Sequence, residues 1–197
     1  MRVVAGKYRG TNLYTLEGNN TRPTKDMVKE ALFSSLMVMP DESFLDIFSG
    51  SGAIGIEAIS RGLSDVIFND YNRDACKIIE KNLDKIKVKK KVYNLDYKDL
   101  LNSLKTSFDY IFADPPYAFE HYDELFELIQ KNNLLNKKGI IVLEVKSDNK
   151  LKERFGAYLL YKERKYGISK LLYYRKEENQ WLKLYIQDRL ILLLLDI

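Results

Sequence analysis

The sequence predicts an α/β fold in which helices cover both faces of a mostly parallel sheet. From residue 44 to about residue 174, short runs rich in β-branched and aromatic residues alternate with runs whose apolar residues follow helical spacing. Hydrophobic residues make up 46% of the chain and charged residues 30%, which is the mix of a globular protein. A chain of 197 residues can bury a core as one domain with short appendages.

The predicted elements follow this alternation in order. Five runs have the composition of strands in a parallel sheet: 43–48, 65–69, 92–95, 108–113 and 139–145. Four runs between them have helical spacing: 53–61, 74–85, 97–104 and 122–130. Two further runs, 158–162 and 170–174, predict an antiparallel pair at the C-terminal end. Right-handed crossovers bring the carboxyl ends of parallel strands to one edge, so we expect the chemistry in the loops after the strands.

Residues 1–40 precede this core as an appendage. Residues 2–5 and 12–16 flank a turn and predict a hairpin. Thr24 is predicted to cap a helix that runs to about residue 37, with Asp26 in its first turn. We divide the chain into this appendage, a core domain at 41–176, and an extension at 177–197 for which the sequence predicts no role. The appendage carries Arg2, Lys7, Arg9, Arg22 and Lys25.

Charge and composition limit the partners of the chain. Basic residues outnumber acidic ones by six to three in 1–40 and by ten to six in 151–197, whereas the middle is slightly acidic. Basic ends suit a polyanion, and an acidic middle suits a small cation. One Cys and one His exclude an internal disulfide and the usual four-ligand zinc site. With no secretory signal and no apolar run of about 18 residues, we expect a cytoplasmic monomer without a metal.

A glycine-rich loop follows the first core strand. Gly50, Gly52 and Gly55 form the pattern G-x-G-x-x-G directly before a predicted helix. The first two glycines let a ligand approach the backbone, and the third lets the helix pack closely on the sheet. Asp70 ends the next strand twenty residues after Gly50, where a carboxylate can accept both hydroxyls of a ribose. The combination predicts a cofactor that contains adenosine.

The charge of Asp46 helps to choose between two such cofactors. A dinucleotide brings a pyrophosphate to the helix N-terminus, where a carboxylate at Asp46 would repel it. S-adenosylmethionine (SAM) instead carries a sulfonium and an amino group, and a carboxylate attracts both. Asp46 therefore favours SAM. We predict that Asp46 binds the cofactor together with four residues of this loop: Phe48, Gly50, Ser51 and Gly52.

The sequence Asp114-Pro115-Pro116-Tyr117 follows the fourth core strand. Two prolines cannot continue the hydrogen-bond ladder, so the chain leaves the sheet in a rigid turn. This turn fixes two acceptors, the Asp114 carboxylate and the Pro115 carbonyl, which can both bind one planar –NH₂ group and draw its lone pair out of conjugation. The Tyr117 ring offers a face for a flipped-out base. We predict that Asp114, Pro115, Pro116 and Tyr117 are the catalytic residues.

These motifs resemble those of class I SAM-dependent N-methyltransferases, and more narrowly those of the RsmD family. The narrower resemblance rests on RVVAGKYRG at 2–10, TRPT at 21–24 and VKEALF at 28–33, and it extends from Arg2 to about Tyr174. The family methylates the exocyclic N2 of one guanine, guanine 966, in 16S ribosomal RNA. The resemblance therefore implies a Rossmann-like sheet, SAM as the cofactor and 16S rRNA as the partner. Naked RNA and the assembled small subunit both stay open as substrate forms.

The resemblance also implies roles for single residues. Gly50 and Gly52 line the SAM loop, Asp70 binds the ribose, and Asp96 contacts the adenine amino group. The catalytic turn keeps the roles given above. By the same analogy the basic residues of the N-terminal hairpin and the segment around Arg22 contact RNA.

Four other functions stay open at this point. DNA adenine N6-methyltransferases also use turns of the DPPY type, but the flanks of this core leave little room for a domain that reads DNA sequence. Methylation of a protein glutamine uses a related turn that typically begins with Asn, whereas position 114 is Asp. A dinucleotide oxidoreductase gives no reason for the DPPY turn. The fourth alternative is a nucleic-acid-binding module with a vestigial SAM pocket.

Overall fold

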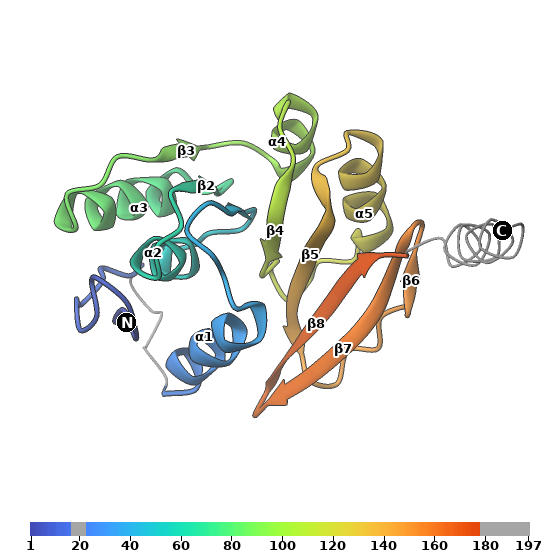
Figure 1. Ribbon diagram of the computed structural model, residues 1–197, viewed down its shortest axis with the longest axis horizontal. Coiled ribbons are helices and arrows are strands. Elements are labelled where there is room, and N and C mark those ends of the chain that lie inside the picture. The colour runs from blue at the N-terminus through green and yellow to red at the C-terminus, as the bar shows by residue number, and fades with distance from the viewer. Residues whose placement is uncertain (17–22, 178–197) are drawn as a thin grey trace, which may run out of the picture.

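The computed structural model describes residues 1–16 and 23–177, without the side chains of residues 23–25. Within these ranges the chain forms one sheet with helices on both faces (Figure 1). The helices are α1 (Pro23–Leu36), α2 (Ala53–Ser60), α3 (Arg73–Lys85), α4 (Tyr97–Ser103) and α5 (Tyr122–Lys131). The strands are β1 (Ser43–Asp46), β2 (Asp65–Asn69), β3 (Lys91–Tyr93), β4 (Phe108–Ala113), β5 (Leu135–Lys146), β6 (Arg154–Phe155), β7 (Tyr158–Tyr166) and β8 (Ser169–Lys176).

The order of the strands places the candidate motifs at one point of the sheet. It runs β3-β2-β1-β4-β5-β8-β7-β6, with β1 to β5 parallel and β8 antiparallel to both β5 and β7. The predicted fold class, a mostly parallel sheet with a C-terminal antiparallel hairpin, is confirmed. The direction of winding reverses between β1 and β4, which is where open α/β sheets bind ligands. The glycine-rich loop follows β1 and the DPPY turn follows β4, so both flank this switch point.

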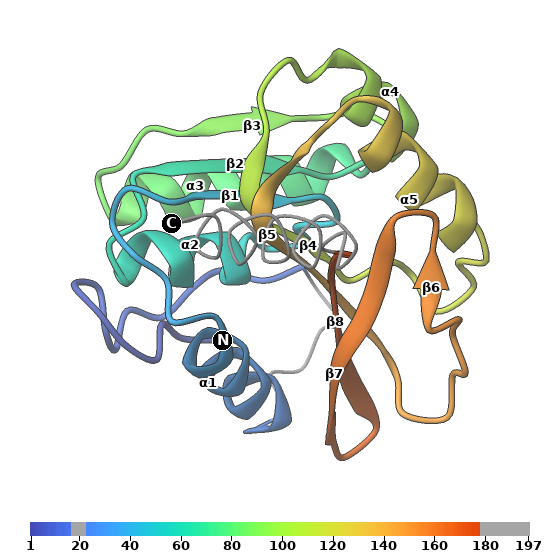
Figure 2. The same cartoon turned by 45° about the vertical axis from the view of Figure 1, so that its right-hand side comes forward.

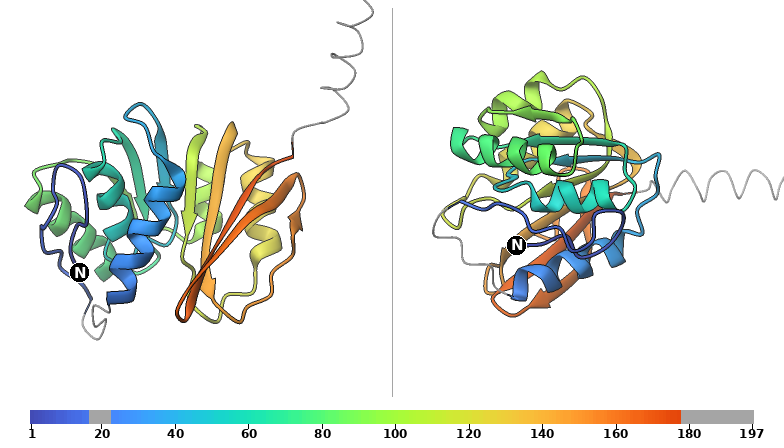
Figure 3. Two further views of the ribbon diagram at one scale, coloured as in Figure 1. Left: turned by 60° about the horizontal axis from the view of Figure 1, so that its bottom comes forward. Right: turned by 90° about the vertical axis from the view of Figure 1, so that its left-hand side faces the viewer.

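Alternating side chains of the sheet build two separate cores. In β1, Phe44 packs on the side covered by α1, α2 and α3, whereas Leu45 packs on the side covered by α4 and α5. Both residues are fully buried. Figure 2 shows the helices on the two faces, and Figure 3 shows α1 beside the β7–β8 hairpin, where it packs against β7. Burial on both faces explains the almost continuous apolar sequences of the central strands.

The N-terminal appendage differs from the expectation in two respects. The predicted hairpin is reduced to one antiparallel bridge between Arg2 and Asn12, because the next backbone N–H groups bond to α2 instead. The predicted cap at Thr24 is wrong, since α1 already begins at Pro23. Proline is favoured in the first turn of a helix because its missing N–H would have no partner there.

The C-terminal hairpin is longer than predicted. β7 and β8 pair from Tyr158 with Lys176 to Tyr166 with Ser169, and the short strand β6 extends the sheet beyond β7. The predicted strand 158–162 leaves out the second half of β7, Glu163 to Tyr166, because this part is rich in charged residues. These residues lie near the edge of the sheet, where much of the strand contacts solvent and charged side chains are common.

Candidate functional site

The glycine-rich loop after β1 takes backbone conformations that favour glycine. Gly50 has φ 55° and Gly52 has φ 76°, a region that favours glycine. A Cβ at Gly50 would meet no atom within 4 Å, so this part of the backbone faces open space. A Cβ at Gly55 would instead lie 2.2 Å from Cε1 of Phe68, so the third glycine lets α2 lie directly on β2. Gly52 differs from Gly50, because a Cβ there would lie 3.1 Å from Cγ1 of Ile79 in α3.

Asp70 connects this loop to the end of β2. Its Oδ2 accepts a hydrogen bond of 2.8 Å from the Gly50 N–H, and its Oδ1 accepts one of 2.8 Å from the Asn72 N–H. A carboxylate has about four lone-pair sites, so each oxygen keeps capacity for a further donor. The half-buried carboxylate therefore lies at the loop and can still accept ribose hydroxyls.

Asp46 is a buried carboxyl group with one oxygen left without a partner. Its side chain is 1% exposed, and its Oδ2 accepts a hydrogen bond of 3.2 Å from the Gly55 N–H. Oδ1 has no hydrogen-bond partner among the described residues. Burial raises the pKa of Asp46 to about 7, the Gly55 N–H opposes this rise, and the charge of Asp70 adds to it. An unpartnered buried carboxyl at the end of β1 suits a cationic ligand.

Asn69 holds the strand ends together beneath the loop, a role that the sequence analysis missed. Its Nδ2 donates to the carbonyls of Ile47 at 3.0 Å and Leu95 at 3.1 Å, and its Oδ1 accepts from the Leu95 N–H at 3.2 Å. These bonds connect the ends of β1, β2 and β3. The one signal in the sequence is an amide at the end of an otherwise apolar strand, since a buried amide must find partners.

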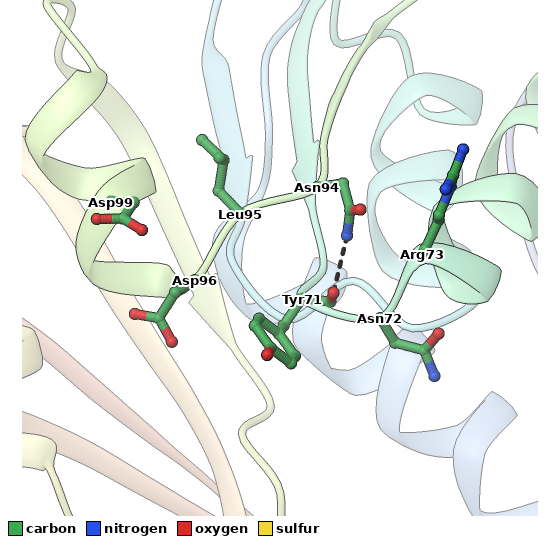
Figure 4. A pocket seen from close by; sticks show the side chains of 7 residues that line it. All are labelled: Tyr71, Asn72, Arg73, Asn94, Leu95, Asp96 and Asp99. Carbon is green, nitrogen blue, oxygen red and sulfur yellow. Dashed lines mark hydrogen bonds between the residues drawn. The ribbon is translucent and has the colours of Figure 1, made fainter.

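A hollow of about 650 Å³ lies beside Asp70, at the carboxyl ends of β2 and β3 (Figure 4). The segment after β2 is fixed to the segment after β3 by Asn94, whose Nδ2 donates to the carbonyls of Asp70 at 2.9 Å and Tyr71 at 2.8 Å. Asp96 lines the hollow and also caps α4, because its Oδ1 accepts from the Lys98 N–H at 2.9 Å. The lining residues are Tyr71, Asn72, Arg73, Asn94, Leu95, Asp96 and Asp99.

The DPPY turn presents its polar and aromatic groups at the surface. Asp114 and Tyr117 are exposed, Tyr117 at 70%, whereas Pro115 is buried and anchors the turn. The Pro116 carbonyl accepts a hydrogen bond of 2.8 Å from the Phe119 N–H, so the chain folds back after the prolines. Burial raises the pKa of Tyr122, and the negative charge of Asp114 adds to this rise.

An aromatic cluster joins the glycine-rich loop to the DPPY turn. The ring of Phe48 lies 5.6 Å from that of Phe119 and 5.9 Å from that of Tyr97. Phe119 also contacts Tyr122 at 5.0 Å in an edge-to-face arrangement. Such pairs stabilise a fixed orientation beyond the area that they bury. Phe48 therefore couples the loop after β1 to the turn after β4, across the switch point of the sheet.

The N-terminal segment is fastened to α2 by buried polar groups. Glu57 is fully buried and accepts hydrogen bonds from the N–H groups of Val4 at 2.8 Å and Ala5 at 3.0 Å. Ser60 binds the same segment, because its Oγ accepts from the Tyr8 N–H at 2.9 Å. A Cβ at Gly6 would lie 1.9 Å from the Ser60 carbonyl oxygen, so only glycine fits there. No local pattern in the sequence indicates the roles of Glu57 and Ser60, because their partners lie more than fifty residues away.

A second buried side chain links this segment to the cofactor loop. Asn82 of α3 accepts from the Tyr14 N–H at 2.8 Å and donates to the carbonyls of Tyr14 at 3.0 Å and Ser51 at 2.9 Å. Ser51, which we predict to bind the cofactor, is thus held through its backbone by α3. The N-terminal segment and the glycine-rich loop are neighbours in the fold.

The predicted RNA-binding residues do not all have the same surroundings. Lys7 and Arg9 are exposed on the N-terminal segment. Arg2 is also exposed, but its Nε lies 3.5 Å from the Asp26 carboxylate. Arg22 lies outside the described residues, and so does the side chain of Lys25. The structure therefore groups Arg2, Lys7 and Arg9 on one segment.

The described ranges contain neither a candidate metal centre nor a candidate membrane span. No three or more His, Cys, Asp or Glu side chains come together in 1–16 and 23–177 as a group that could hold a metal ion. None of the helices in these ranges has the length and apolar character that a bilayer crossing needs.

Comparison with known proteins connects this site to methyl transfer. A family model described as Conserved hypothetical protein 95 matches residues 1–175. Bacillus subtilis YlbH, named as a candidate rRNA methyltransferase, is 35% identical, over 89% of this chain and 99% of its own. Ribosomal RNA small subunit methyltransferase D of Haemophilus influenzae is 34% identical, over 77% of this chain and 81% of its own. The solved structure of Escherichia coli yhhF, named as a candidate methyltransferase, has a TM-score of 0.80 at 31% identity, covering 90% of this chain and 98% of its own.

These relatives confirm SAM as the cofactor, and the residues at the site fit it. The open backbone at Gly50 admits a ligand, and the unpartnered Oδ1 of Asp46 suits a cationic group. The hollow beside Asp70 offers room beyond the ribose position. When bound, SAM supplies a methyl group that is already activated by its sulfonium charge.

The raised pKa of Asp46 predicts a pH dependence. Between its ordinary value of 3.8 and about 7, the group is protonated in the folded chain and ionised in the unfolded chain. Its contribution to stability is therefore full below 3.8 and is lost as the pH rises through about 7. A cationic cofactor favours the ionised form, so SAM should bind more tightly as the pH rises through about 7, with release of a proton.

Titration calorimetry of SAM binding, in two buffers of different ionisation enthalpy, measures this proton. The control is Asp46→Asn, because the amino group of SAM titrates identically in both proteins. We expect the variant to bind SAM more weakly and with less proton release below pH 7. Equal proton release by wild type and variant would show that Asp46 is not the titrating group.

Proposed function

Because the chain belongs to the family described as Conserved hypothetical protein 95, we propose that it transfers a methyl group from SAM to the exocyclic N2 of a guanine in 16S ribosomal RNA. The names of the relatives support ribosomal RNA as the substrate. The family resemblance given above supports guanine N2, and guanine 966 in particular. The observation that carries the proposal is the DPPY turn, which stands at the switch point with Tyr117 exposed and the cofactor loop joined to it through Phe48.

The turn can orient the amine without a strong base. The Asp114 carboxylate and the Pro115 carbonyl accept hydrogen bonds from the two N–H groups of the guanine amine. The nitrogen lone pair then leaves conjugation with the ring and points at the methyl group. Bound SAM would supply the methyl group to this nitrogen, its sulfur would keep the bonding electron pair, and the surplus proton would leave to water. Orientation of this kind accounts for much of the rate, because the methyl donor is already activated.

Tyr117 and the cofactor residues complete the site. The exposed ring of Tyr117 stacks on the flipped guanine, an interaction worth roughly 1–3 kcal/mol for each base. Asp70 accepts the ribose hydroxyls of SAM, and Asp96 lies at the hollow where it can accept from the adenine amino group. The remaining residues of the proposed cofactor set are Asp46, Phe48, Gly50, Ser51 and Gly52.

The N-terminal appendage, residues 1–40, is the proposed RNA-contacting part of the chain, and residues 41–176 form the methyltransferase domain. Lys7 and Arg9 stand exposed on the segment that Glu57 and Ser60 hold, so their charges are available to phosphates. Arg2, Arg22 and Lys25 complete the proposed set of RNA-binding residues. We also propose that the enzyme acts as a monomer in the cytoplasm, where its RNA substrate is made.

Arg9→Ala should weaken RNA binding without unfolding the chain. The side chain is exposed, so its loss removes one phosphate contact and little packing. We expect the slope of log affinity against log salt concentration to fall by about 0.7, the value for one contact to single-stranded RNA. Filter binding across a salt series measures this slope. The control is Lys105→Ala, because Lys105 is an exposed lysine before β4. Wild-type affinity of Arg9→Ala at low salt would assign the segment a purely structural role.

The experiment that tests the proposal is methyl transfer from labelled SAM. Small subunits that lack the modification, naked 16S rRNA and duplex DNA are offered as substrates, and the products are digested to nucleosides. We expect labelled N2-methylguanosine from RNA or subunits, and the productive substrate identifies the form that the enzyme recognises. Label on DNA adenine would contradict the proposal and favour a DNA enzyme. SAM binding without transfer to any of the substrates would favour a binding module.

A further inference from the structure

Lys146 and Tyr117 form a contact that neither the proposed site nor the family motifs include. The Nζ of Lys146 lies 4.6 Å from the centroid of the Tyr117 ring. Lys146 ends β5, whereas Tyr117 lies in the turn after β4, so two adjacent parallel strands bring the pair together. The ammonium lies over the electron-rich face of this exposed ring.

The backbone of Lys146 is held firmly, so this charge has a defined place. Lys146 pairs with Ser169 at the start of β8, and the N–H of Ser147 donates to the Ile168 carbonyl at 2.9 Å. Both partners belong to the tip of the β7–β8 hairpin. The carboxyl ends of β4 and β5 lie at the same edge of the sheet, and the hairpin tip lies beside the carboxyl end of β5.

The charges around this tip suit a polyanion. Arg164 and Lys165 of β7 are exposed near the tip. The nearby Glu163 is already engaged by Lys170, with 3.4 Å between Nζ and Oε1. Two acidic side chains lie equally close in sequence to Lys146: Asp148 is exposed in the turn after β5, and Glu144 is half-buried in β5 itself. Basic side chains therefore outnumber acidic ones around this tip. In the sequence, this surface lies at the opposite end of the chain from the basic N-terminal segment.

We propose that Lys146 is an RNA-binding residue that also positions Tyr117, an inference that rests on the proposed function. The ammonium holds one face of the ring and leaves the other face to the flipped guanine. From the same place it binds a phosphate of the RNA strand next to that nucleotide. The stacking surface and the phosphate contact are thereby combined in one pair of side chains, and the β7–β8 hairpin tip becomes part of the RNA interface.

The test compares Lys146→Gln, Lys146→Arg and Lys138→Gln with the wild type. Gln removes the charge, whereas Arg keeps it and can still lie over the ring. Lys138 is an exposed lysine near the other end of the same strand, so it controls for loss of a charge. For each protein the measurements are the KM and kcat for RNA methylation over a salt series, and the Kd for SAM.

We expect Lys146→Gln to raise the KM for RNA by roughly 3- to 10-fold, with a salt slope smaller by about 0.7 and an unchanged Kd for SAM. Lys146→Arg should restore most of the affinity, and Lys138→Gln should resemble the wild type. A wild-type KM and salt slope in Lys146→Gln, or an equal effect of Lys138→Gln, would overturn the inference while the proposed function stands. A wild-type protein that methylates no RNA would overturn both.

Discussion

Asp114→Ala is expected to abolish methyl transfer while SAM still binds. The variant loses the carboxylate that orients the target amine, but Asp114 lies on the DPPY turn rather than among the residues that hold SAM. Loss of one such preorganised group costs at least about 100-fold in kcat in comparable sites. We expect the Kd for SAM to stay within about 2-fold of the wild-type value, because Asp114 is not one of the residues proposed to bind SAM. Single-turnover methylation and titration calorimetry measure the two quantities.

Two further variants sharpen this test. Asp114→Asn keeps one acceptor oxygen, so it should retain more activity than the alanine variant. Asp123→Ala removes an exposed carboxylate of α5 whose partner is Lys152 at 2.7 Å, and it should leave methyl transfer unchanged. If Asp114→Ala instead lost SAM binding, Asp114 would belong to the cofactor site and the assignment of the turn would be wrong.

Gly55→Ala is expected to destabilise the fold more than the same substitution at either of the other two glycines of the glycine-rich loop. The new Cβ would lie 2.2 Å from Cε1 of Phe68, and that ring is fully buried in β2. Alanine favours a helix over glycine by about 1 kcal/mol. Overpacking of a core costs about 1–3 kcal/mol and sometimes more, and the severity of this clash places it at the upper end. We therefore expect a net loss of about 2 kcal/mol, or a fall in Tm of roughly 4–8 °C.

Urea unfolding and thermal unfolding measure this loss, with Gly50→Ala as the comparison. The Cβ at Gly50 meets no atom within 4 Å, so strain at φ 55° is its main cost. Its larger effect should be weaker SAM binding, because the backbone there faces the proposed ligand. An unfolding midpoint of Gly55→Ala equal to that of the wild type would show that α2 and β2 can separate without cost.

Much of the candidate site could be predicted from the motifs in the sequence and from the family that they resemble. The glycine-rich loop, Asp70 and the DPPY turn each follow a strand at short range, so their positions depend on local pattern and on the topology of parallel sheets. The strands of the parallel core were found within a few residues, apart from the start of β5. The predictions of the methyltransferase family and of its cofactor are confirmed. They rested on several separate motifs along the chain that agreed with one another.

The parts that sequence reasoning missed depend on contacts between distant residues. Glu57 binds the N–H groups of Val4 and Ala5 from more than fifty positions away, and no local pattern indicates that pairing. The same bonds explain why the predicted N-terminal hairpin is only a bridge. Asn69 and Asn82 look like ordinary polar residues in the sequence, yet both are buried and fully engaged at the site.

The sequence by itself determined the order of the elements, the edge of the sheet at which the candidate site lies and the kinds of side chain found there. Only the tertiary structure decided which side chains meet across that edge. Burial of Asp46 sets its pKa, Phe48 couples the cofactor loop to the catalytic turn, and Lys146 lies over Tyr117. Local patterns report backbone conformation over a few residues, whereas burial and side-chain contacts arise only when separate strands and helices pack together.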